Sequence, residues 1–370
     1  MDEGPPFRAD HVGSLLRPPE LLAARDRFAS GELSAEALAE AEDEAIRSVV
    51  AMQESVGLRS ATDGEFRRSS WHMDFIYQLG GVVRTEGTIA VDFRNEHETL
   101  SFTPSGLAVT ERVHLDHPIF ADAFRSLTSM VTSAVPKLTI PSPSMVHYRG
   151  GRAAISTEVY PDLGRFWSDL AAAYRDEISA LAGLGCRYLQ FDDTSLAYLN
   201  DPKQRAYIAS QGGDPDHQHE TYIDMINAAL SAKPDSMAIT THMCRGNFRS
   251  SWAAEGSYDF VAEALFGRLN VDGFFLEYDD ARSGGFAPLR FVPKGKRVVL
   301  GLVTTKRGEL ERKDELKRRI DEASQFVPLD QLCLSPQCGF SSTVEGNTLT
   351  YDEEVAKLAL IVEVAQEVWG

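Results

Sequence analysis

Cysteine is scarce in this chain, with four residues among 370, which is too few for the disulfide framework of a small secreted domain. Positive charge is also in deficit: 37 lysines and arginines against 55 aspartates and glutamates leave a formal net charge of −18. Such an acidic chain is a poor partner for nucleic acid or an anionic membrane. No apolar run approaches the roughly 20 residues that cross a bilayer, and the N-terminus lacks the pattern of a signal peptide. These absences predict a cytoplasmic protein with reduced thiols.

What the sequence has instead is an alternation of short apolar segments with longer helical ones, typical of a parallel sheet built from βα units. Strands are expected near 8–13, 58–63, 136–142, 187–192, 237–243, 271–277, 297–303 and 331–335. Helices are expected at 34–56, 162–184, 222–232, 312–326 and 352–369. Eight strands with alternating helices predict an α/β protein with a closed (β/α)8 TIM barrel, and residues 1–370 are expected to form that one domain.

One segment departs from the repeat. Residues 79–135 are too many for a simple βα connection, and the stretches 88–93 and 107–110 alternate as strands do. They predict a β-hairpin inserted after strand 2, followed by a helix near 121–133. Long ordered insertions of this kind often form lids or contacts between subunits. The sequence is therefore compatible with a homo-oligomer.

Candidate metal ligands follow the predicted strand ends. His242 and Cys244 are one residue apart, so on an extended strand end their side chains point the same way, about 7 Å apart. Glu277 ends the next predicted strand, and Cys338 follows the last one. Two thiolates, an imidazole and a carboxylate can hold one soft tetrahedral metal ion, for which zinc is the usual occupant.

The barrel prediction brings further polar residues to the same place. Ser14, the motif Asp63-Gly64-Glu65 and Asp192 lie at or just past the C-terminal ends of predicted strands. A (β/α)8 barrel carries its active site at that face. Cys186 and Cys333, by contrast, lie within apolar strand segments and are expected to be small buried hydrophobic residues.

With these motifs in place, the chain resembles the catalytic domain of cobalamin-independent methionine synthase and its shorter single-domain relatives. The resemblance spans nearly the whole chain and rests on motifs in the family's order: His11-Val12-Gly13-Ser14, Asp63-Gly64-Glu65, Gln190-Phe191-Asp192-Asp193, His242-Met243-Cys244, Glu277 and Cys338-Gly339. It implies zinc-dependent methyl transfer to the thiol of homocysteine, giving methionine, with 5-methyltetrahydrofolate as the nominal donor. It also implies that the carboxylate ligand moves away when the substrate thiol arrives.

The resemblance also implies substrate residues. Asp192 matches the carboxylate that holds the amino group of the amino acid, and Glu65 and Ser14 match its partners around the same ligand. Asp192 and Glu65 are therefore the expected catalytic carboxylates. His11 and Arg17 flank Ser14, and an arginine there could bind a substrate carboxylate bidentately, although local packing explains both residues equally well.

Two departures from the large enzyme leave the methyl donor open. The chain is expected to hold the catalytic barrel without the second, N-terminal barrel of the large enzyme, and residues 301–306 read Gly-Leu-Val-Thr-Thr-Lys where the large enzyme has a histidine associated with acid catalysis. Methylfolate and a methylcorrinoid are both candidate donors. Two alternatives also stay open: a transferase of the epoxyalkane:coenzyme M type that uses the same zinc, and a non-catalytic barrel with a purely structural zinc. A glutamate ligand at the barrel mouth favours a site that opens.

Overall fold

The framework of the computed structural model, which describes residues 4–87, 89–95 and 98–370, is a curled parallel sheet of seven strands. Their order is β1-β6-β7-β8-β9-β10-β11, and all pairings between neighbours are parallel. Most of these strands are buried along their whole length, as expected where both faces of a parallel sheet are covered. The strands are β1 (Ser60–Ala61), β6 (Val135–Pro141), β7 (Tyr188–Asp193), β8 (Ala238–Met243), β9 (Gly273–Glu277), β10 (Arg297–Val303) and β11 (Leu332–Pro336).

Residues 8–15 bridge the two edge strands of this sheet without forming a regular strand. On one side, Ala9 makes a single parallel bridge to Leu334 of β11. On the other side, the Thr62 hydroxyl, just past β1, donates to the Gly13 carbonyl at 2.6 Å. Gly13 has a φ of 142°, a conformation that interrupts an extended run and that glycine adopts easily. The continuous first strand predicted at 8–13 is a short segment with an isolated bridge at Ala9, and Gly13 ends its extended course.

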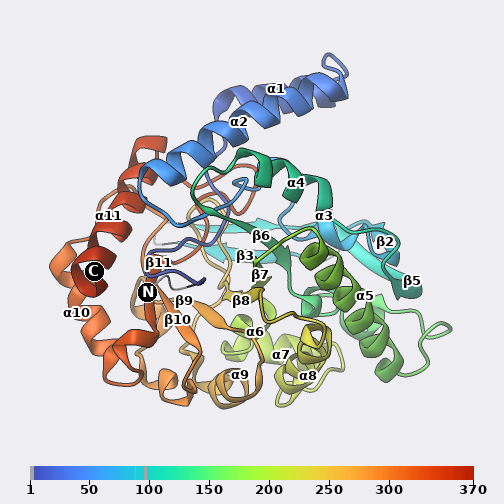
Figure 1. Ribbon diagram of the computed structural model, residues 1–370. Coiled ribbons are helices and arrows are strands. Elements are labelled where there is room, and N and C mark those ends of the chain that lie inside the picture. The colour runs from blue at the N-terminus through green and yellow to red at the C-terminus, as the bar shows by residue number, and fades with distance from the viewer. Residues whose placement is uncertain (1–3, 88, 96–97) are drawn as a thin grey trace.

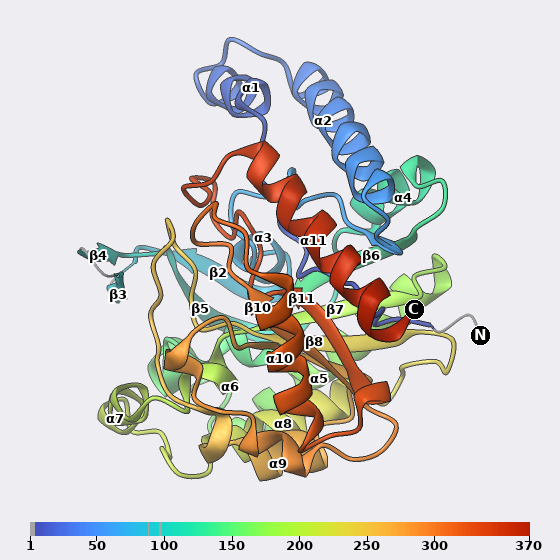
Figure 2. The same cartoon turned by 90° about the vertical axis from the view of Figure 1, so that its left-hand side faces the viewer.

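Helices cover the outside of the sheet, while α1 and the start of α2 project away from it (Figures 1 and 2). Side-chain caps set several helix starts: Ser34 caps α2, Asp162 caps α5, and Thr350 with Glu353 forms a capping box on α11. None of the described helices is long and apolar enough to cross a membrane. The helices are α1 (Pro19–Ala29), α2 (Ala35–Ser55), α3 (Met73–Ile76), α4 (Ala121–Met130), α5 (Leu163–Gly183), α6 (Ser195–Tyr198), α7 (Pro202–Ser210), α8 (Gln218–Leu230), α9 (Ala262–Arg268), α10 (Lys313–Ser324) and α11 (Tyr351–Trp369).

The long segment between β1 and β6 forms two antiparallel pairs instead of one simple hairpin. The outer pair joins β2 (Gly80–Thr85) to β5 (Gly106–His114), and the inner pair joins β3 (Val91–Arg94) to β4 (Thr99–Phe102). The inner pair reaches the loop after β8, where the backbones of Arg94 and Trp252 exchange hydrogen bonds of 2.7 and 2.9 Å. Residue 88, where the predicted alternation begins, lies outside the described residues. The insertion therefore extends toward the carboxyl ends of the strands.

Candidate functional site

Four potential metal ligands meet at the carboxyl ends of three strands. His242 lies in β8 and Cys244 directly follows it, Glu277 ends β9, and Cys338 follows β11. All four are buried, and their ligand atoms lie within 4.8 Å of one another. The two Sγ atoms are 3.4 Å apart, far longer than a disulfide bond of about 2.05 Å. Two thiolates on one tetrahedral ion, each at about 2.3 Å from it, would be roughly 3.8 Å apart.

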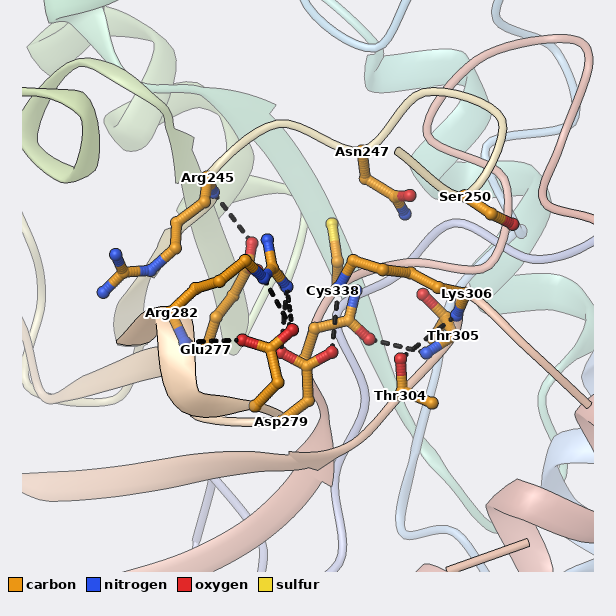
Figure 3. A network of polar contacts seen from close by, with 12 residues as sticks. Arg245, Asn247, Ser250, Glu277, Asp279, Arg282, Thr304, Thr305, Lys306 and Cys338 are labelled. Carbon is orange, nitrogen blue, oxygen red and sulfur yellow. Dashed lines mark hydrogen bonds and ion pairs between the residues drawn. The ribbon is translucent and has the colours of Figure 1, made fainter. Parts of the chain in front are cut away.

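The hydrogen bonding of this cluster fits a metal ion. Among the described residues, both ring nitrogens of His242 and Oε2 of Glu277 are buried without a hydrogen-bond partner, and buried polar atoms seldom stay unpaired. The other carboxylate oxygen, Oε1, accepts a hydrogen bond of 2.8 Å from the backbone N–H of Arg245 (Figure 3). Two sulfurs, one imidazole and one free carboxylate oxygen are therefore the donor set of this candidate metal centre.

The cluster holds protons that a metal ion would displace. Contact with the Cys244 thiol, together with nearby His242, keeps the pKa of Cys338 well below its usual value, although burial opposes this. The same contact and burial raise the pKa of Cys244. Burial also raises the pKa of Glu277 to about 7, against the opposing charge of Lys306. Metal binding at such a site releases protons and weakens as the pH falls.

A pair of carboxylates lies beside the cluster. Asp192 is directly opposite His242 in the β7–β8 register, and Gln190 donates to its Oδ1 at 2.7 Å. Glu65 follows β1, and its Oε1 accepts from the hydroxyl of Thr139 at 2.8 Å. Burial, followed by the charge of Glu65, raises the pKa of Asp192 to about 7. Two carboxylates in a water-poor pocket suit a cationic group such as an ammonium.

The backbone at Glu65 adopts an unfavourable conformation and is held there by a hydrogen bond from Arg17. Its φ is 62°, which is uncommon outside glycine and is typical of functional positions. The guanidinium of Arg17 donates to the Glu65 carbonyl at 2.9 Å and to the Ser341 hydroxyl at 2.9 Å. Arg17 therefore joins the loops that follow β1 and β11.

Not every predicted substrate residue faces the same space. One cavity of about 330 Å³ is lined by Ser14, Glu65, Asp192, His242, Cys244 and Cys338. Arg17 and His11 are not among the described residues that line it. His11 is buried, and its burial together with the charge of Lys137 lowers its pKa to about 4. The structure thus gathers three of the five predicted substrate residues around the cavity.

An aromatic outer wall of this cavity was missed by sequence reasoning. Phe93 and Phe102 come from the inserted β3–β4 pair, and Phe248 comes from the loop after Cys244. The Phe102 ring stacks on Phe248 with a centroid distance of 5.1 Å, and Phe93 is 5.3 Å from the same ring. The one sequence signal that could have revealed it is the position of Phe248, four residues past a metal-ligand candidate.

The fold and the site define an α/β protein with a candidate metal centre at the carboxyl ends of its parallel strands. Residues 7–367 match the family described as "Cobalamin-independent synthase, Catalytic domain", and the chain belongs to this family. The resemblance found from the motifs is thereby confirmed. Because the family is of the methionine synthase type, the protein is classed as an enzyme, a methyltransferase.

Individual relatives agree with this assignment. The chain is 48% identical to YxjH, an uncharacterized protein of Bacillus subtilis, over 98% of this chain and 95% of that protein. It is 23% identical to the 5-methyltetrahydropteroyltriglutamate–homocysteine methyltransferase of Bacillus licheniformis, over 97% of this chain but 42% of that protein. A solved structure of a putative vitamin-B12 independent methionine synthase from Listeria monocytogenes matches with a TM-score of 0.80, 39% identity and full coverage of both chains.

Proposed function

We propose that this enzyme transfers a methyl group to the thiol of homocysteine and forms methionine, and that it depends on zinc held by His242, Cys244, Glu277 and Cys338. The observation that carries the proposal is one cavity lined both by three of these ligand candidates and by two buried carboxylates. Homocysteine has a thiol and an ammonium group, and the cavity offers a partner for each. Zinc in such a ligand set lowers the pKa of a thiol that binds to it.

The protein's own residues position the amino-acid end of the substrate. Asp192 and Glu65 accept hydrogen bonds from the ammonium group, and Ser14 lies beside them in the cavity wall. Arg17 acts from behind this wall by holding the Glu65 carbonyl, whereas His11 is buried outside the cavity lining and is given no direct contact with the substrate. With this end fixed, sulfur approaches the methyl carbon in line, the S–C bond forms, and the electron pair of the breaking bond stays on the donor. Fixing both partners supplies a large part of the rate gain.

The proposed enzyme has the closed (β/α)8 architecture that was expected from the sequence. Residues 1–370 act as one catalytic domain, a closed (β/α)8 barrel in which the bridged segment 8–13 takes the first strand position and the insertion covers one side of the mouth. The enzyme works in the cytoplasm, where thiol ligands stay reduced. Its nominal donor is 5-methyltetrahydropteroylglutamate or its triglutamate form.

The test is a screen of acceptors and donors on the zinc-loaded protein, with methionine and S-methyl coenzyme M both measured by mass spectrometry. Homocysteine and coenzyme M are compared as acceptors, and methylfolate and methylcobalamin as donors. Coenzyme M carries a sulfonate, which the carboxylates of Asp192 and Glu65 should repel. Preference for coenzyme M, or no methionine from either donor, would contradict the proposal. Zinc-edge X-ray absorption adds a second readout, because homocysteine should add a sulfur neighbour to a catalytic zinc and leave a structural zinc unchanged.

A further inference from the structure

The backbone pairing between β8 and β9 includes His242 but stops just before two other candidate metal ligands, Cys244 and Glu277. The last paired residues are Met243 and Leu276, so Cys244 and Glu277 each lie one residue beyond the ladder. On its other side, Glu277 is still paired with Gly301 of β10. The separation of the two ligand-bearing ends therefore depends on contacts other than the β8–β9 sheet pairing.

Tyr258 connects the ends of β8 and β9 beyond their backbone pairing. It begins the short 3-10 helix η3 (Tyr258–Phe260), in the loop that leaves β8, and its side chain is fully buried. Its hydroxyl accepts a hydrogen bond from the Glu277 N–H at 3.0 Å and donates one to the Met243 carbonyl at 3.4 Å. The Arg245 guanidinium carbon lies 4.4 Å from the ring centroid and holds the ring against this loop. One hydroxyl thus bonds to the ends of both strands.

Glu277 is held at its side chain as well. The Arg245 N–H, next to Cys244, donates to Oε1 at 2.8 Å (Figure 3). With its backbone fixed by Tyr258 and one carboxylate oxygen fixed by Arg245, Glu277 has a single oxygen, Oε2, that lacks a partner among the described residues. These contacts identify Oε2 as the oxygen available to the metal centre.

We infer that Tyr258 is a positioning residue of the metal centre, whose hydroxyl joins the ends of β8 and β9 and so sets the affinity for the metal ion. The inference rests on the proposed zinc site. Residues that orient metal ligands typically change metal affinity by about 10- to 100-fold when they are removed. Without the Tyr258 hydroxyl, the buried N–H of Glu277 would lose its partner, and the strand end could shift to satisfy it.

Tyr278 provides a matched control. It directly follows Glu277, is fully buried, and its ring centroid lies 5.5 Å from that of Tyr258. Its hydroxyl, unlike that of Tyr258, has no hydrogen-bond partner among the described residues. The changes Tyr258→Phe and Tyr278→Phe therefore remove the same atom from neighbouring buried rings, and only the first removes contacts to the strand ends.

The experiment compares the full-length wild type, Tyr258→Phe and Tyr278→Phe by three measurements: zinc affinity from competition with a chromophoric chelator, the visible spectrum of the cobalt(II)-substituted protein, and thermal unfolding of the metal-free protein. Tyr258→Phe should weaken zinc binding by about tenfold or more and alter the cobalt spectrum. Tyr278→Phe should stay within about twofold of the wild type, since it breaks no bond.

Two results would overturn the inference. Unchanged zinc affinity and cobalt spectrum in Tyr258→Phe, with only a lower unfolding temperature, would make Tyr258 a purely structural residue. An equal loss of zinc affinity in Tyr278→Phe would assign the effect to general packing. A wild-type protein that binds no zinc would instead refute the proposed function itself, and the inference with it.

Discussion

Replacement of Asp192 by asparagine should raise the free energy of unfolding and lower the affinity for homocysteine. In the metal-free protein, burial and the neighbouring Glu65 raise the pKa of Asp192 from 3.8 to about 7. A folded-state pKa above the unfolded value means that the folded protein is most stable at low pH, where the group is protonated. Stability is then lost as the pH rises from about 4 to about 7.

The size of this loss follows from the shift. A shift of about three pKa units corresponds to roughly 4 kcal/mol, which is an upper limit for the cost of ionising Asp192 in the fold. Asparagine carries no charge and can still accept the hydrogen bond from Gln190. Asp192→Asn should therefore raise the free energy of unfolding by about 2–4 kcal/mol at pH 8 and by almost nothing at pH 4.

Substrate affinity should change the other way. The variant loses one charge-assisted hydrogen bond to the ammonium group of homocysteine, worth about 1.5–3 kcal/mol, while Glu65 remains. Homocysteine binding should weaken by roughly 10- to 100-fold. Zinc content should be unchanged, because Asp192 is not in the ligand cluster.

Two titrations check both halves of this prediction. Urea unfolding of the metal-free wild type and variant between pH 4 and 8 measures the stability difference, and calorimetric titration of the zinc-loaded proteins measures homocysteine affinity. Parallel stability curves over this whole pH range would show that the raised pKa does not belong to Asp192. Loss of zinc from the variant would place Asp192 among the metal ligands and refute its assigned role.

Three further predictions concern the metal, the fold and the donor. The purified protein should hold about one zinc per chain; Cys244→Ser or Cys338→Ser should remove most of it by elemental analysis, whereas Cys186→Ser and Cys333→Ser should retain it. Burial raises the pKa of Glu354 to about 8, so Glu354→Gln should stabilise the protein by roughly 1–3 kcal/mol at pH 9 and less at pH 5, measured by thermal unfolding. Initial rates of methionine formation should be lower with methylfolate than with methylcobalamin, because a methyl group on a tertiary amine needs protonation before transfer; equal rates would show that another residue supplies the proton.

Much of the regular structure could be predicted from the sequence, because the hydrophobic patterns and capping residues that specify a helix or strand lie within or next to that element. The helix expected at 34–56 is observed at Ala35–Ser55, with Ser34 as its side-chain cap. The first strand was predicted too regularly, since the pattern at 8–13 does not show that this segment makes only an isolated bridge, from Ala9 to Leu334 of β11. Local pattern therefore predicted the elements better than it predicted how the sheet edges meet.

The candidate metal cluster could be predicted for a different reason. Each of its residues lies at or just past the carboxyl end of a strand, and parallel strands bring their carboxyl ends to one face whatever the loops do. Phe102 and Tyr258 could not be found in this way. Phe102 reaches the cavity through the insertion, and Tyr258 reaches Glu277 through an irregular loop. Their positions depend on long-range loop contacts, which no short sequence pattern encodes.

The two halves of the cavity thus have different physical origins. The inner half, with the candidate metal cluster and the carboxylate pair, is built at or just past strand ends, which hold side chains more precisely than long loops do. The outer half is built on the insertion and on the loop after Cys244, joined by the backbone bonds between Arg94 and Trp252. That same loop carries Arg245 and Tyr258, which hold Glu277. Phe248 of the aromatic wall and the contacts that hold Glu277 therefore lie on one loop.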